Sequence, residues 1–171
     1  ILKLKKVKIK ICGIKDSTTL VCCQKNNVSF YGLIFYKTSP RNVSIELASE
    51  LISSQTNYKI FPVGVFVDHN IKDLYYIINK LNLQYIQLHG NEDNIYISKL
   101  KDKFGVKIIK AIGIRSKNDL EKIKMYPNTD YYLFDYKPKK NELPGGNAKS
   151  FDWSLLKKIN INKPWFISGG I

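Results

Sequence analysis

The sequence is poor in the residues on which several protein classes depend. Only two of its 28 basic residues are arginines, and it has two histidines and three cysteines. Specific base readout relies heavily on arginine, and no helix-turn-helix, zinc-finger or RNP pattern occurs, so the net charge of +14 does not predict nucleic-acid binding. The lysines are spread along the whole chain, which indicates a compositional drift towards lysine, asparagine and isoleucine. Their field would still attract a small anionic molecule.

The scarcity of cysteine and histidine limits the other kinds of site. An odd number of cysteines does not form a disulfide framework, and the neighbouring Cys22 and Cys23 lack metal-ligand spacing. We therefore expect no metal site, and a reducing, cytoplasmic compartment. No apolar run approaches the ~18 residues of a membrane span, and the start does not resemble a signal peptide, so we expect no membrane contact.

What the sequence does contain is a regular alternation of buried strands and amphipathic helices. Its 171 residues, 44% hydrophobic and 25% charged, suit one globular domain, residues 1–171. Alternation of this kind indicates a parallel sheet covered by helices. Short apolar runs predict strands at 7–12, 30–36, 61–67, 85–88, 106–112, 130–134 and 163–167. Helical spacing predicts helices at about 17–25, 44–54, 71–81, 92–104, 116–125 and 153–159.

Two features favour a (β/α)₈ TIM barrel over an open doubly wound sheet. A nucleotide-binding open sheet would have a glycine-rich turn after its first strand, and the segment 12–15, Cys-Gly-Ile-Lys, is not one. A barrel needs an eighth strand, so the sequence looks cut short after the seventh, and we expect two unpaired sheet edges. In addition, chemically useful residues end nearly every predicted strand, at the rim where barrels build active sites; they are Cys12, Arg41, Asp68, His89, Asp135, Gly169 and Gly170.

Cys12 is the last side chain of a strand in which apolar and polar residues alternate. Lys10 lies two residues earlier on the same face of that strand. Its ammonium group would favour the thiolate form of Cys12, which is the basic and nucleophilic form of cysteine. The alternative is a small buried cysteine without a chemical role.

Asp135 follows an apolar strand, and it suits a general acid. A half-buried carboxyl group without a strong partner tends to keep its proton, although the residue could instead be a cap or a surface aspartate. His89 follows Gln87 on one strand face, and both should look into the barrel mouth unless His89 is a structural, hydrogen-bonded histidine. Asp68 is expected to be solvated or a helix cap.

Three rim residues suit an anion. Arg41 presents a planar fork for a carboxylate or phosphate, or else it is a surface arginine. Gly169 and Gly170 come after the seventh strand, where barrels bind phosphate through backbone N–H groups, but such a pair serves equally well as a tight turn.

Six short motifs follow one another along the chain, at 10–14, 63–67, 87–92, 133–135, 145–153 and 168–170. Each motif alone is weak evidence, but their order and spacing taken together are highly specific. Together they resemble the phosphoribosylanthranilate isomerase family, from residue 8 to the last residue. The resemblance implies a (β/α)₈ barrel enzyme of tryptophan biosynthesis. It would convert N-(5-phosphoribosyl)anthranilate to 1-(2-carboxyphenylamino)-1-deoxyribulose 5-phosphate by an Amadori rearrangement, without a cofactor.

The resemblance also implies roles for individual residues. Cys12 matches the general base and Asp135 the general acid, while Arg41 matches the arginine that holds the anthranilate carboxylate. The remaining matches are Gln87 and His89 on substrate-lining positions, and Gly169 and Gly170 on half of the phosphate site.

The sequence departs from the family pattern in two places. The glycine-rich loop has Ala148 where the family has glycine, which puts in doubt any role that needs a positive φ there. The family's last strand and helix are absent, with the Ser-Ser-Gly loop that completes the phosphate site, so we expect the chain to be unstable or inactive without them.

Two other interpretations remain. One is another phosphate-binding barrel enzyme, such as a relative of indole-glycerol-phosphate synthase, although that family relies on a lysine and glutamates. The other is a catalytically inactive, basic, RNA-binding barrel. The expected partner is a small phosphorylated molecule rather than nucleic acid or a membrane, and both a homodimer and a fusion to a pathway enzyme stay open.

Overall fold

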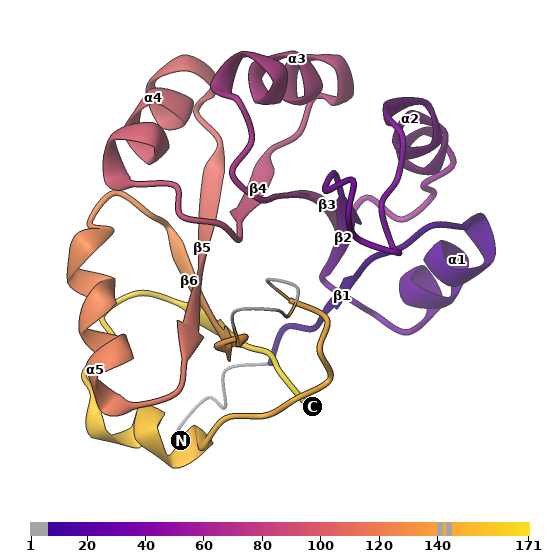
Figure 1. Cartoon of the computed structure of the whole chain (residues 1–171). Helices are drawn as coiled ribbons and strands as arrows, with labels where there is room; N and C mark the ends of the chain where they lie inside the picture. The colour runs from indigo at the N-terminus through magenta and orange to yellow at the C-terminus, as the bar shows by residue number, and fades with distance from the viewer. Residues whose placement is uncertain (1–6, 140–141, 143–144) are drawn as a thin grey trace, which may run out of the picture.

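The computed structural model describes residues 7–139, 142 and 145–171, and its strands form one parallel sheet (Figure 1). The strand order is β1-β2-β3-β4-β5-β6-β7, so each strand pairs with the next one along the chain. This is the arrangement that the barrel prediction requires of its first seven strands. The strands are β1 (Lys10–Cys12), β2 (Phe30–Ile34), β3 (Phe61–Phe66), β4 (Tyr85–Leu88), β5 (Lys107–Ile114), β6 (Tyr131–Tyr136) and β7 (Trp165–Ile167).

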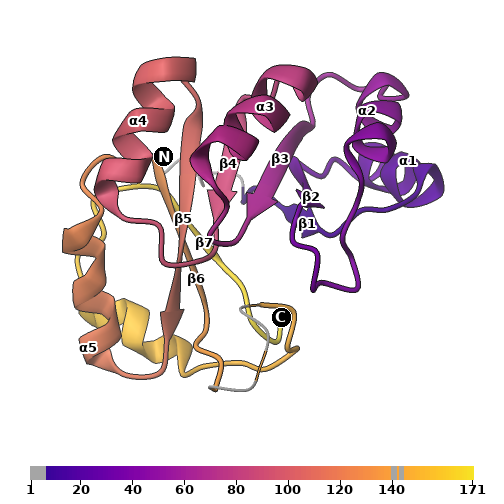
Figure 2. The ribbon, with the colours of Figure 1, turned by 45° about the horizontal axis from the view of Figure 1, so that its top comes forward.

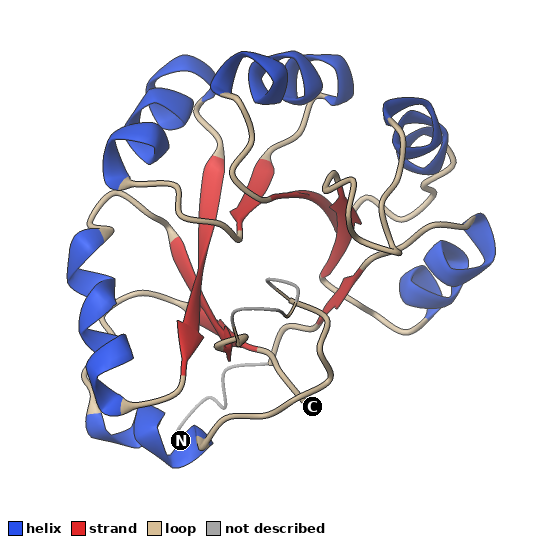
Figure 3. Cartoon of the chain, in the orientation of Figure 1, coloured by secondary structure: helices blue, strands red, loops and turns tan. Residues whose placement is uncertain are grey.

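Helices lie outside the curved sheet, as the secondary-structure view shows (Figure 3). Polar N-caps set where they begin: the Asp16 carboxylate, for example, accepts a hydrogen bond of 2.7 Å from Thr19 N. The helix expected at 92–104 begins at 94 because Asp93 is its cap. The helices are α1 (Ser17–Lys25), α2 (Ile45–Ser53), α3 (Ile71–Leu81), α4 (Asn94–Phe104) and α5 (Lys117–Leu120), with 3₁₀ turns η1 (Glu121–Met125) and η2 (Trp153–Lys158).

Two packing layers hold the fold together. Between sheet and helices lies the larger apolar core. Inside the ring, apolar side chains from β2 to β6 pack together, and Phe30 meets Phe166 of β7 edge-on with ring centroids 5.6 Å apart. These rings fill much of the interior near the starts of the strands.

The ring has a gap between its first and last strands, and the C-terminal end of the chain lies near this gap (Figures 1 and 2). Across the described residues, β1 and β7 share no ladder, and the outward side chains there are exposed: Ile9 by 50%, Ile11 by 40% and Trp165 by 44%. The two unpaired edges and exposed apolar residues expected from the sequence are therefore present. None of the helices in the described ranges is long and apolar enough to span a bilayer.

Candidate active site

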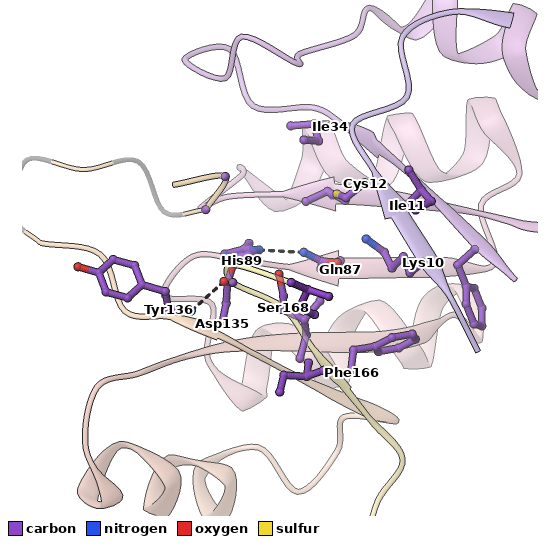
Figure 4. A pocket seen from close by; sticks show the side chains of 18 of the residues that line it. Lys10, Ile11, Cys12, Ile34, Gln87, His89, Asp135, Tyr136, Phe166 and Ser168 are labelled. Atoms are coloured by element: carbon purple, nitrogen blue, oxygen red, sulfur yellow. Dashed lines mark hydrogen bonds and ion pairs between the residues drawn. The ribbon is translucent and has the colours of Figure 1, made fainter. Parts of the chain in front are cut away.

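All the predicted site residues line one cavity of about 1050 Å³ at the open end of the ring (Figure 4). Cys12 and Lys10 come from β1, Gln87 from β4 and Asp135 from β6, so separate strands surround a common space. The cavity also runs along the gap between β1 and β7. The remaining predicted lining residues are Arg41, His89, Gly169 and Gly170.

The Cys12 thiol and the Lys10 ammonium group both lie against Gly32 of β2. A Cβ atom at position 32 would lie 2.6 Å from Cys12 Sγ and 3.1 Å from Lys10 Nζ. A side chain at position 32 would therefore push the thiol and the ammonium group away from their present positions. The Gly32 carbonyl also accepts backbone hydrogen bonds from Gly13 N (2.9 Å) and Ile14 N (3.0 Å), which fixes the turn after Cys12.

Arg41 is held against the same turn. Its Nη1 donates a hydrogen bond of 2.9 Å to the Cys12 carbonyl, and its side chain crosses Gly13, where a Cβ would lie 2.6 Å from Arg41 Cδ. Gly13 has a φ of +87°, which also favours glycine. The guanidinium thus lies at the cavity wall, and the Cys12 carbonyl takes one of the five N–H donors that an arginine carries.

Asp135, His89 and Gln87 form a chain of polar groups on the opposite wall. The Asp135 carboxyl is buried, and its Oδ2 lies 3.5 Å from His89 Nε2 while its Oδ1 accepts from Tyr136 N at 2.8 Å. His89 Nδ1 lies 2.8 Å from Gln87 Nε2, so a donating Gln87 leaves the proton of a neutral imidazole on Nε2, facing Asp135. His89 is thus a neighbour of Asp135, and it would be a charged partner only with a protonated imidazole.

Gly169 and Gly170 line this wall with main-chain atoms only, because neither residue has a side chain. Their φ values are +85° and +70°, and a Cβ on Gly169 would lie 2.8 Å from Asp135 Oδ1 and 2.8 Å from the Lys149 carbonyl. Side chains are therefore excluded at the point where the loop after β7 covers the carboxyl group. Such a glycine pair can present N–H groups to an anion, as the sequence suggested.

The loop 145–149 covers the cavity, and a Cβ on its Gly145 would lie 3.2 Å from His89 Nε2. Ala148 in this loop has a φ of +51°, so the chain keeps the left-handed conformation even though the residue is not glycine. Ala148 therefore keeps the positive φ that was in doubt at this position, at the cost of local backbone strain.

We expect Ala148→Gly to stabilise the protein by about 0.5–1 kcal/mol, because glycine adopts a positive φ without a steric penalty. The matched control is Ala48→Gly within α2, which should destabilise by about 1 kcal/mol. Urea unfolding measures both. Equal destabilisation by the two glycines would contradict the assigned backbone of the loop.

Positive charge outweighs negative charge around the cavity. Lys10, Arg41 and Lys149 line it, and within the described part of the lining Asp135 is the one carboxylic acid. Lys149 also pairs with Glu142, and this hydrogen bond raises the pKa of the lysine. The described residues contain no group of three His, Cys, Asp or Glu side chains that could hold a metal ion. The cavity therefore suits a small organic anion.

Asp68 is the one predicted rim residue that does not line the cavity. Its Oδ1 accepts from Asn91 N at 2.5 Å and its Oδ2 from Asn91 Nδ2 at 3.2 Å, while the helix that follows is capped by Asn70. Asp68 is exposed, as expected of a solvated residue, but it does not cap the helix. It ties the loop after β3 to the loop after β4.

Comparison with known proteins shows which family has this sequence and fold. A family model described as N-(5'phosphoribosyl)anthranilate (PRA) isomerase matches residues 9–171. The chain belongs to this isomerase family. An isomerase of that name from Rhodospirillum centenum is 37% identical over 168 residues, covering 96% of this chain and 78% of the relative. The one from Sinorhizobium medicae is 38% identical over 169 residues, covering 97% and 78%.

Solved structures of phosphoribosylanthranilate isomerases have the same fold. The crystal structure from Thermotoga maritima superposes with a TM-score of 0.83 at 27% identity, covering 97% of this chain and 78% of that one. A structure of the isomerase in complex with reduced 1-(o-carboxyphenylamino)-1-deoxyribulose 5-phosphate gives a TM-score of 0.80 at 26% identity, covering 97% and 77%. Another Thermotoga maritima structure is of monomers generated from a dimeric isomerase.

Sequence reasoning gave Gly32 no place in this isomerase-like site, and it included Gly145 only as part of the glycine-rich loop that carries the resemblance. A glycine inside an otherwise bulky, apolar strand often marks a close approach of another group, so Gly32 carried a usable signal. Nothing local to Gly145 indicated that it would face His89, because the two residues are far apart in the chain and meet only in the folded protein.

Proposed function

We propose that the protein converts N-(5-phosphoribosyl)anthranilate to 1-(2-carboxyphenylamino)-1-deoxyribulose 5-phosphate, with Cys12 as general base and Asp135 as general acid. Family membership supports the reaction and its place in tryptophan biosynthesis. The observation that carries the assignment of roles is that a thiol from β1 and a buried carboxyl group from β6 line one cavity. An acid and a base that act on different substrate atoms should flank the ligand in this way.

In the first step Asp135 would give its proton to the ring oxygen of the ribose. The ring then opens to an iminium ion at C1′, and the former ring oxygen becomes the C4′ hydroxyl. His89 directs Nε2 at the Asp135 carboxyl from 3.5 Å and can hold the carboxylate that remains. The backbone of Gly169 packs closely against the same carboxyl group.

In the second step the Cys12 thiolate would remove the proton at C2′, which the adjacent iminium makes acidic. The electron pair moves into a C1′–C2′ double bond and neutralises the nitrogen, giving an enolamine. Proton transfer from the C2′ hydroxyl to C1′ then completes the tautomerisation to the ketone. Cys12 has then gained one proton and Asp135 has lost one, and proton exchange with solvent returns both groups to their starting forms.

The remaining lining residues would hold the ligand at its two charged ends. Arg41 suits the anthranilate carboxylate, because its fork is anchored beside Cys12 and faces the cavity. The N–H groups of Gly169 and Gly170 suit the phosphate. Gln87 orients His89, and its buried Oε1, which has no protein partner within the described residues, is available to a ligand hydroxyl.

Lys10 would favour the thiolate of Cys12, since both groups lie against Gly32. We expect Lys10→Met to lower activity near neutral pH and to move the rising limb of the pH–rate profile to higher pH, because removing a nearby cation disfavours the anionic base. Steady-state rates across pH test this. An unchanged profile would show that Lys10 does not tune the thiol.

The direct test of the reaction is turnover of N-(5-phosphoribosyl)anthranilate by the full-length protein, followed by the decay of substrate fluorescence. Conversion without added metal or cofactor is the expected result. Absence of turnover, with salt-dependent binding to a polynucleotide, would instead favour a non-catalytic basic protein.

A further inference from the structure

A buried ion pair that the proposed mechanism does not use lies just outside the cavity wall. Glu92, in the loop after β4, and Lys110, on the outer face of β5, are joined at 2.8 Å, with their side chains 2% and 1% exposed. Lys110 Nζ also lies 5.3 Å from the centre of the Tyr126 ring. Removing two charges from water costs several kcal/mol for each ion, and apolar residues of similar size often stabilise a fold as well. Stability alone is therefore a weak reason for this pair.

The pair holds both sides of one residue, Gly90. Glu92 Oε2 accepts from Gly90 N at 3.0 Å, and Lys110 Nζ donates to the Gly90 carbonyl at 2.7 Å. Glu92 Oε1 accepts in addition from Asp68 N at 2.9 Å. The Asp68 carboxylate binds Asn91, so the loops after β3 and β4 are fixed to each other and to β5.

His89 is the residue directly before Gly90, and hydrogen bonds hold the backbone on both sides of it. His89 N donates to the Phe66 carbonyl at 2.8 Å, and the peptide that follows is held by Glu92. A side chain at position 90 is excluded, because a Cβ there would lie 2.7 Å from Asp68 N. Main-chain contacts from an ion pair behind the sheet thus set the direction in which the imidazole faces Asp135.

We propose that Glu92 and Lys110 are positioning residues that fix His89 against Asp135. They touch no substrate atom in the proposed reaction. Their effect on rate rests on the proposed function, in which Asp135 delivers the proton, whereas their effect on the His89 ring does not. A misplacement of about 1 Å at such a site can cost about 10²-fold in rate.

The informative variant is the double substitution Glu92→Gln/Lys110→Met in the full-length protein. It leaves no unpaired buried charge, so the fold should survive, while Gly90 loses its carbonyl partner. We expect kcat to fall about ten- to a hundredfold with a smaller change in KM. The ¹⁵N signals of the His89 ring, identified by their loss in His89→Asn, should shift.

The control is Lys101→Met, which removes the 3.0 Å ion pair between α4 and Asp130, next to the start of β6 and away from the cavity. It should lower the unfolding temperature and leave both kcat and the His89 ring signals unchanged.

Three outcomes separate the proposals. Unchanged kcat and unchanged ring signals in the double variant would overturn the positioning role. Equal effects of the control on both readouts would reduce that role to general stability and would also overturn it. If the wild-type protein does not turn over the substrate but the double variant still shifts the His89 ring signals, positioning is supported and the proposed function is overturned.

Discussion

Asparagine at position 135 is expected to lower kcat by about 10²- to 10⁴-fold, with little change in KM. The amide has nearly the shape of the carboxyl group and can still accept the 2.8 Å hydrogen bond from Tyr136 N, so the wall of the cavity should keep its form. It has no acidic proton to give to the ribose ring oxygen. Steady-state kinetics by substrate fluorescence measures the loss.

Asp130→Asn is the matched control for this change. Burial alone would raise the pKa of Asp130, but hydrogen bonds from Ile108 N and Lys101 outweigh it and hold the pKa below its usual value. Stability from this group is present at neutral pH and is lost as the pH falls through the folded-state pKa. The control should therefore lose stability at neutral pH and keep its kcat. Near-wild-type turnover by the Asp135 variant would remove that residue from the mechanism.

Serine at position 12 is expected to lower kcat by about 10²- to 10⁴-fold. A hydroxyl group is hardly ionised at neutral pH, whereas a thiol is a few per cent to mostly thiolate depending on its surroundings. Oxygen is smaller than sulfur, so the hydroxyl fits against Gly32, where the thiol now lies. Folding and KM should change little, and the same fluorescence assay reports the rate.

Cys22→Ser controls for the loss of a thiol, since Cys22 is exposed on α1 and outside the cavity. Its activity should equal that of the wild type. A Cys12→Ser protein that kept full activity would mean that another group removes the C2′ proton.

The positions of the main site residues could be predicted because the C-terminal ends of all strands in a parallel barrel lie at the same end of the barrel. Cys12 and Asp135 end strands that the apolar runs already outlined, and both line the cavity. The predicted ends of elements were less accurate where pairing decides them. β5 runs to Ile114, two residues beyond its apolar run, because it pairs with β6 as far as Tyr136.

Contacts between loops could not be predicted in the same way. The approach of His89 to Asp135, the bond from Asp68 to Asn91 and the pair of Glu92 with Lys110 join separate β/α units. No periodicity or spacing within one segment encodes them. On α1, four successive apolar residues 20–23 do not show from the sequence which of them face the core; Leu20 and Cys23 are buried, while Val21 and Cys22 are exposed.

The assignment of Cys12 as the base and Asp135 as the acid can be tested with substrate that carries deuterium at C2′. In Cys12→Ser the removal of the C2′ proton becomes the slow step, so deuterium should lower kcat strongly. In Asp135→Asn ring opening becomes the slow step, so deuterium should have almost no effect. The reverse pattern, or the same isotope effect in both variants, would contradict the assignment of base and acid to these two residues.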